Sequence, residues 1–216
     1  MFPLRDVIPS RTTPYVTVTI IALNALAWFF ELSLSRPELN RFLQIYGVVP
    51  AFFSAPTLIT SMFLHGSWSH VIGNMWYLWI FGDNVEDRVG HGRFVVFYLL
   101  CGVAAAFGQM AMTPQSTLPT IGASGAIAGV MGAYLVLYPH SRVLTLVPLL
   151  FYYEIFELPA VFLLGVWFLL QLVSAGAIAA TASTGGGVAF MAHVAGFIVG
   201  VVGIFAFRKR ETPQWI

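Results

Sequence analysis

The chain has 216 residues, of which 58% are hydrophobic and only 9% are charged, and its mean hydropathy is +0.83. An ordinary globular domain carries roughly a quarter charged residues, so this composition excludes a soluble or disordered protein. Ten Lys and Arg residues against nine Asp and Glu leave a net charge of +1, which provides no basic face for a nucleic acid. The expected surroundings are therefore a lipid bilayer.

The first uncharged stretch, 12–30, predicts one membrane-spanning helix at 16–30. Pro14 is well placed to begin this helix, because proline favours the first helical position. Arg5 and Arg11 precede it as in a signal peptide, but the apolar run is longer than a signal core and no small-residue cleavage site follows. We expect an anchor that is retained.

The second uncharged stretch, 42–82, is long enough for two spans, but prolines and a polar cluster at 61–69 interrupt its first half. We expect one membrane-spanning helix, at 68–81. The preceding part, 42–64, is rich in Phe and Leu, which predicts a loop with short helices that lie in the membrane interface.

Two longer uncharged stretches, 94–141 and 158–207, are each interrupted once, at 113–120 and at 181–187. Each stretch therefore predicts two helices, which brings the total to six. The fourth helix, at 124–138, is too short to cross a bilayer from surface to surface. Its amino end is expected below the outer surface, in a water-filled depression.

The distribution of Lys and Arg orients these six helices, because positive residues gather in the cytoplasm. Of the ten Lys and Arg residues, Arg36 and Arg41 fall on one side of the predicted bundle. The other eight fall on the opposite, cytoplasmic side: Arg5, Arg11, Arg88, Arg93, Arg142, Arg208, Lys209 and Arg210. The predicted fold class is an all-α membrane protein, a six-transmembrane-helix bundle with an interfacial first loop and both termini cytoplasmic. It forms a single domain over 1–216, with its core at about 14–207.

Four polar residues inside the spans are the candidates for function, because a polar side chain in a membrane helix is costly and usually functional. His70 and Asn74 share one face at the start of the second helix. Ser124 begins the fourth helix, and His193 lies about one and a half turns into the sixth, which is expected to start near residue 188. Helices two, four and six run in the same direction, so all four residues are expected at one depth in the outer leaflet.

Small residues at every fourth position predict that the fourth and sixth helices pack closely, since this pattern lets two backbones approach. These ridges are Gly125, Gly129 and Ala133 on the fourth helix, and Ala192, Gly196 and Gly200 on the sixth. Ser124 and His193 border them, which predicts a catalytic dyad in which histidine takes the serine proton. His70, Asn74 and the backbone N–H of Ser124 can donate hydrogen bonds to a developing oxyanion.

Less specific interpretations exist for each residue taken alone. A membrane-helix serine often bonds a carbonyl of its own helix, and His70 with Asn74 could merely cap a helix. His65 and His70 lack a third ligand at zinc spacing, so we expect no metal. No carboxylate is an evident third partner of the dyad, although Glu31 and Glu38 in the outward-facing loop stay open.

The ordered motifs His70-x-x-x-Asn74, Gly122-Ala123-Ser124-Gly125 and Ala192-His193-x-x-Gly196 resemble those of the rhomboid intramembrane serine proteases. The resemblance implies hydrolysis of peptide bonds in or beside transmembrane segments of other membrane proteins, without metal, nucleotide or organic cofactor. Ser124 would be the nucleophile and His193 the general base, with His70, Asn74 and the Ser124 amide at the oxyanion.

The same resemblance assigns roles to several loops and exposes two departures. It implies an interfacial first loop at 36–66, a cap over the active site at 176–187, and a lateral substrate gate where Phe162 and Trp167 face the second helix. Many members carry an aromatic residue where this chain has Ala128, so another group must orient His193. The Trp-Arg pair common in the first loop is also missing.

The expected function is that of an intramembrane serine endopeptidase in a multi-pass membrane protein of a prokaryotic cell (inner) membrane. Its expected partners are transmembrane protein substrates and the lipid bilayer, with no nucleic acid. The alternative is a catalytically silent relative that binds transmembrane clients. A channel or transporter would need ionisable residues along a continuous path, whereas here the polar set stops in the outer half.

Overall fold

The computed structural model describes residues 1–149, 152–181 and 189–209. Helices dominate this part of the chain. The helices expected to span the membrane correspond to α1 (Tyr15–Ser33), α4 (Trp68–Val89), α5 (His91–Met112), α6 (Ser124–Leu137), α7 (Ala160–Thr181) and α8 (Phe190–Phe207).

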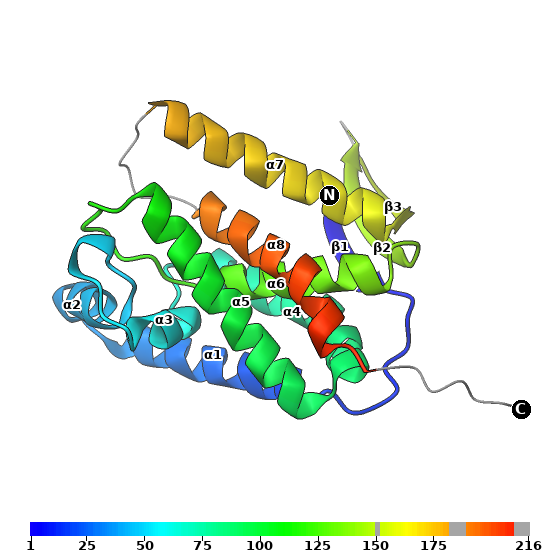
Figure 1. Cartoon of the computed structure of the whole chain (residues 1–216), viewed down its shortest axis with the longest axis horizontal. Coiled ribbons are helices and arrows are strands. Elements are labelled where there is room, and N and C mark those ends of the chain that lie inside the picture. The colour runs from blue at the N-terminus through cyan, green and yellow to red at the C-terminus, as the bar shows by residue number, and fades with distance from the viewer. Residues whose placement is uncertain (150–151, 182–188, 210–216) are drawn as a thin grey trace, which may run out of the picture.

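Helix α6 lies at the centre of the bundle, in contact with α4, α5 and α8 (Figure 1). Every residue from Gly125 to Tyr134 is buried, whereas the other long helices are buried on one side only. Glycine and alanine supply much of this segment, so the neighbouring backbones can approach it closely. The predicted short fourth helix is confirmed, with its first residue at Ser124.

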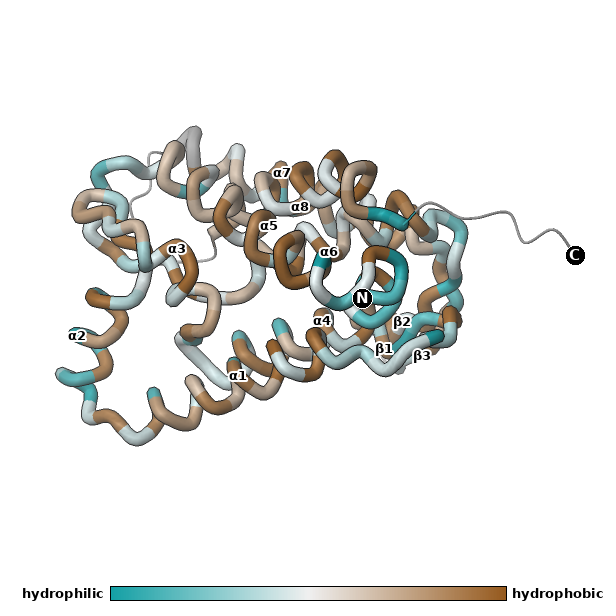
Figure 2. Tube along the Cα trace, turned by 60° about the horizontal axis from the view of Figure 1, so that its bottom comes forward, coloured by the Kyte–Doolittle hydropathy of each residue, from teal (hydrophilic) through white to brown (hydrophobic). Residues whose placement is uncertain are grey.

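Among the described residues, four helices are long and apolar enough to cross a membrane: α1, α5, α8 and the part of α7 up to Ile178. Helix α6 is shorter, with 14 residues, and α4 carries Asp83, Glu86, Asp87 and Arg88 near its end. Helix α4 therefore continues past its predicted end at residue 81. Figure 2 shows hydrophobic residues along the helices and hydrophilic ones near the N-terminus and the sheet.

A three-stranded antiparallel sheet corrects the prediction of an all-α fold. Strands β1 (Phe2–Asp6), β2 (Arg142–Leu149) and β3 (Tyr152–Pro159) pair in the order β1-β2-β3. The sequence analysis placed Arg142, between α6 and α7, on the cytoplasmic side and assigned no strand there, but the β-branched and aromatic residues of this connection favour strands. Val143 and Thr145 alternate as buried positions of β2. The Asp6 carboxylate accepts hydrogen bonds from Tyr134 at 2.7 Å and Asn84 at 2.9 Å, which fixes β1 to α6 and α4.

The segment between α1 and α4 contains short helices, as the sequence predicted for this loop. It contains α2 (Arg36–Tyr46), α3 (Thr57–Thr60) and the short 3-10 helices η1 (Pro50–Phe52) and η2 (Ser61–Phe63). An isolated antiparallel bridge between Val48 and Thr120 joins this loop to the connection between α5 and α6. The loop is thereby held at the amino end of α6.

Helix α7 extends further than expected. It is the least enclosed of the four long apolar helices, because only 17% of the residues in its most apolar 18-residue segment are buried. Its last residue, Thr181, lies inside the segment 176–187 that was expected to form a cap. The remainder of that expected cap, from residue 182, lies outside the described residues. Helix α7 packs mainly against α8.

The buried carboxylate of Glu86 in α4 holds the beginning of α1. It accepts hydrogen bonds from the backbone N–H groups of Val16 at 2.9 Å and Thr17 at 2.8 Å, and from the Thr17 hydroxyl at 2.7 Å. His91 Nδ1 lies 2.6 Å from Oε1 of this carboxylate, the same oxygen that accepts the Val16 N–H. An acidic group at a helix amino end satisfies free N–H groups and complements the helix dipole.

We expect Glu86→Ala to destabilise the fold while leaving the chemistry of the folded protein intact. The substitution leaves several buried donors without a partner, at about 1–3 kcal/mol for each. Thermal unfolding in detergent should therefore begin well below the wild-type temperature. Exposed Glu154→Ala is the matched control and should unfold like the wild type. Equal unfolding temperatures for Glu86→Ala and the wild type would contradict this role.

Candidate active site

Ser124 stands at the first position of α6, directly after a turn that only glycine fits well. Gly122 has a φ of +121°, which side chains rarely adopt, and its N–H donates to the carbonyl of Ser61 at 2.9 Å. The turn thus ties the start of α6 to the interfacial loop. The first N–H groups of a helix have no partner within it, so Ser124 sits among free donors.

His193 lies in the first turn of α8, nearer the helix start than the predicted one and a half turns. Its Nε2 atom is 2.8 Å from Ser124 Oγ, although the two residues are 69 positions apart in the sequence. His193 is 9% exposed. The structure therefore brings the predicted nucleophile and base within hydrogen-bond distance.

The glycine ridges explain this closeness. A Cβ atom at Gly196 would overlap the carbonyl oxygen of Gly125, and one at Gly200 would overlap the carbonyl oxygen of Gly129. Helices α6 and α8 therefore pack backbone against backbone, as their small residues predict. On its other side α6 meets α5, where Gly125 faces Ala105.

Widening this contact should reduce activity more than stability. We expect Gly200→Val and Gly129→Val to lower turnover by about 100-fold, because a misplacement of about 1 Å between reacting groups can cost that much. Gly200→Ala should act in the same direction. Gly203→Ala is its matched control on α8, because a Cβ there meets only Phe97 at 3.6 Å. Turnover should be measured beside thermal unfolding, and wild-type turnover in both Val variants would contradict the geometric argument.

His70 and Asn74, on one face of α4, both approach the turn before Ser124. A Cβ atom built on Gly122 would lie 2.7 Å from His70 Nε2 and 3.7 Å from Asn74 Nδ2. The N–H of Gly66 points to His70 Nδ1 at 3.5 Å, which leaves Nε2 as the donor on the side of Gly122. The four predicted site residues thus surround the start of α6.

His65, a buried histidine that the sequence analysis did not assign to the site, forms a hydrogen bond with Asn74. Asn74 Nδ2 lies 3.0 Å from Nε2 of His65, so the amide can donate one N–H there and keep the second for the site. Burial lowers the pKa of His65 to about 4, which keeps its ring neutral and able to accept. The backbone N–H of His65 donates in turn to the carboxylate of Glu31, at 3.2 Å to each oxygen.

The sequence left Glu31 and Glu38 as possible carboxylate partners of the Ser124–His193 dyad, but both have other partners. Glu31 holds the backbone of His65, and Glu38 caps the start of α2 through Ser35. Neither forms a hydrogen bond with His193 among those of the described residues. Within the same residues, no three His, Cys, Asp or Glu side chains are grouped so that they could hold a metal ion.

The partner of His193 Nδ1 is Gln171 of α7, a residue that the sequence reasoning missed. Its Oε1 atom lies 2.8 Å from Nδ1. Trp167, one turn earlier on α7, packs near the imidazole with ring centroids 5.8 Å apart, and also contacts Phe197 of α8. The structure therefore places Trp167 against α8. The one available signal was the position of Gln171, an isolated amide in an otherwise apolar span.

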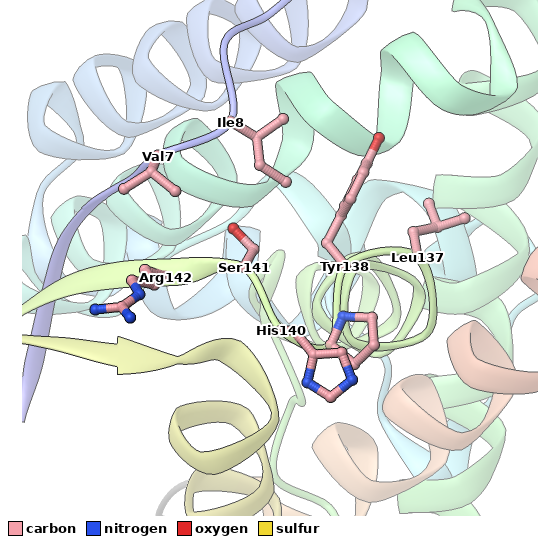
Figure 3. A pocket seen from close by; sticks show the side chains of 8 residues that line it. Val7, Ile8, Leu137, Tyr138, His140, Ser141 and Arg142 are labelled. Atoms are coloured by element: carbon pink, nitrogen blue, oxygen red, sulfur yellow. The ribbon is translucent and has the colours of Figure 1, made fainter.

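A cavity lies far from these residues, at the opposite end of α6 (Figure 3). It has a volume of about 530 Å³ and is lined by Val7 and Ile8 together with the chain from Leu137 to Arg142. None of the four predicted site residues lines it. The cavity therefore does not belong to the site around Ser124.

Comparison with known proteins identifies the family of the chain. The model of the Rhomboid domain matches residues 53–210, which is well over half of the chain and includes all four predicted site residues. Rhomboid protein 1, mitochondrial, from Saccharomyces cerevisiae is 29% identical over 184 residues, which cover 82% of this chain and 50% of that protein. Rhomboid protease GluP from Bacillus subtilis is 38% identical over 78 residues, 36% of this chain and 15% of that protein.

Other relatives broaden the comparison. Presenilin-associated rhomboid-like protein, mitochondrial, from Rattus norvegicus is 34% identical over 132 residues, 58% of this chain and 34% of that protein. The chain spans half or less of the length of these curated relatives. Rhomboid-like protein 11, chloroplastic, from Arabidopsis thaliana is 29% identical over 114 residues, 49% of this chain and 39% of that protein. Because mitochondrial and chloroplastic relatives stand beside a bacterial one, the expected prokaryotic cell membrane is not supported. A multi-pass membrane protein is supported.

Proposed function

Because the chain belongs to the rhomboid family, we propose that it is an intramembrane serine endopeptidase that cuts other membrane proteins in or beside their transmembrane segments. The observation that carries this proposal is the 2.8 Å separation of Ser124 Oγ and His193 Nε2. A serine hydroxyl is a weak nucleophile until a base accepts its proton, and a histidine at this distance can do so.

The proposed reaction begins when Ser124 Oγ attacks the carbonyl carbon of the scissile bond and its proton passes to His193 Nε2. The carbonyl oxygen then becomes an oxyanion. His193 returns the proton to the leaving nitrogen, the peptide bond breaks, and an acyl-enzyme remains on Ser124. Water, activated by the same histidine, releases the acyl group and restores the serine.

The donors for the oxyanion come from two elements. His70 Nε2 and Asn74 Nδ2 approach from α4, and the free N–H groups at the start of α6 approach from the protein backbone. Donors that are already in place stabilise the charge without having to reorganise during the reaction. The amino end of α6 also carries a partial positive charge from the helix dipole.

The proposed topology has six spans, with α4 and α6 added to the four long apolar helices, and with both chain ends in the cytoplasm. Contacts at one end of the bundle support this arrangement. Arg5 pairs with Leu144 in the sheet, the Arg11 N–H donates to Asp87, and the N–H of Lys209 donates to the carbonyl of Arg88. Most positive residues thus gather at this end, as cytoplasmic residues do.

Purified protein in detergent or liposomes, mixed with a model transmembrane substrate, tests the function. The proposal predicts a discrete cut by the wild type and no cut by Ser124→Ala. Mass spectrometry of both fragments should place the cut in or beside the transmembrane segment. Binding of the substrate without any cut by the wild type would favour the alternative, a rhomboid-like protein that holds transmembrane clients.

A further inference from the structure

Gln171 gives His193 a second hydrogen bond, at the ring nitrogen that faces away from Ser124. Gln171 Oε1 lies 2.8 Å from Nδ1, and Nε2 lies 2.8 Å from Ser124 Oγ. The imidazole is therefore held at both nitrogens, by α7 on one side and by α6 on the other.

The chemistry of the two partners decides which nitrogen carries the proton. A carbonyl oxygen can only accept, so Nδ1 must donate to Gln171 Oε1. A neutral imidazole has one N–H, which leaves a lone pair on Nε2. That lone pair is what must receive the proton of Ser124 Oγ.

We propose that Gln171 is a positioning residue, the third member of a Ser124–His193–Gln171 triad, which fixes the tautomer and orientation of the base. This inference rests on the proposed serine protease function. In this assignment Gln171 acts through its hydrogen bond to His193 Nδ1. An aspartate fills this position in many serine hydrolases, whereas here a neutral amide does so within a nearly uncharged helix.

Two further observations support this assignment. Ala128 presents only a methyl group, so no aromatic ring from that position can pack on His193. Trp167 instead lies 5.8 Å from the imidazole, centroid to centroid, and stands four residues before Gln171 on the same helix. Residues four apart share a helical face, so one face of α7 supplies both the hydrogen bond and the ring contact.

The first test removes the acceptor oxygen of Gln171 and keeps the size of the side chain. Gln171→Met has a similar length but no comparable acceptor, and should lower kcat by about 10- to 100-fold with little change in KM, since a buried donor loses its partner. Gln171→Glu keeps an acceptor oxygen and should stay within about threefold of the wild type. Leu170→Met, at an exposed position of the same helix, is the matched control.

A small probe separates positioning from substrate entry. The rate at which a fluorophosphonate modifies Ser124 depends on the dyad and needs no transmembrane substrate. Gln171→Met should slow this rate as much as it slows turnover, while Leu170→Met should label at the wild-type rate. Unchanged labelling and turnover in Gln171→Met, or a loss in Gln171→Glu equal to that in Gln171→Met, would overturn the proposal.

Nitrogen NMR of ¹⁵N-histidine-labelled protein reads the tautomer without any activity. The wild type should show His193 protonated at Nδ1, and Gln171→Met should show a shift toward the other tautomer. A wild-type ring protonated at Nε2 would overturn the positioning role even in an active protease. Turnover by the wild type and its loss in Ser124→Ala decide the protease function separately, so the two failures are distinguishable.

Discussion

Replacing either member of the dyad is expected to remove cleavage of a transmembrane substrate. Ser124→Ala lacks the nucleophile, and His193→Ala lacks the group that accepts its proton across 2.8 Å. Each single variant should lose at least about 1,000-fold in kcat, and the double variant should be no worse, because residues that act as a unit do not contribute additively.

Matched controls distinguish the chemistry from damage to the fold. Ser69→Ala removes a hydroxyl from the amino end of α4, and His140→Ala removes an exposed ring between α6 and β2. Both should cleave at the wild-type rate. All variants should unfold at similar temperatures in detergent. Substantial cleavage by folded Ser124→Ala would exclude this serine as the nucleophile.

Removing an oxyanion donor is expected to have the next largest effect. Asn74→Ala and His70→Ala should each lower kcat by up to about 1,000-fold with a modest change in KM, since their hydrogen bonds strengthen only in the transition state. The basis is the approach of both side chains to the turn at Gly122, directly before Ser124.

Steady-state kinetics with purified protein measure this effect. Ile72→Ala, which shortens an exposed side chain between the two donors on α4, is the control and should keep the wild-type kcat. A structural role would give a different pattern. If Asn74→Ala and His70→Ala unfold at lower temperatures but the remaining folded protein turns over normally, these residues support the fold and not the oxyanion.

The sequence predicted the positions of the long helices well, because strong physical signals mark apolar helices and their ends. A charge is costly inside a bilayer, and glycine and proline end apolar runs, so α6 begins at Ser124 as expected and α8 begins at Phe190, close to the expected start near residue 188. The ridge glycines also predicted the contact of α6 with α8, because few other residues allow two backbones to approach so closely. From these helices, the meeting of Ser124 and His193 followed.

The sheet and the role of Gln171 were missed for different reasons. The chain between α6 and α7 was judged by its charges alone, although alternating Val143 and Thr145 carry a strand signal. Gln171 is a single amide, and its hydrogen bond to His193 depends on how α7 packs against α8. The isolated amide in an apolar span marks Gln171 as unusual, but the sequence alone does not show that its partner is His193.

Labelling with a fluorophosphonate, followed by peptide mass spectrometry, tests the central claim most directly, because the probe reacts only with an activated serine. The wild type should carry the label on Ser124 and on no other serine. His193→Ala should carry almost none, since Ser124 then lacks its base. Absence of label from the folded wild type, or equal labelling of Ser124 in His193→Ala, would contradict a Ser124–His193 dyad.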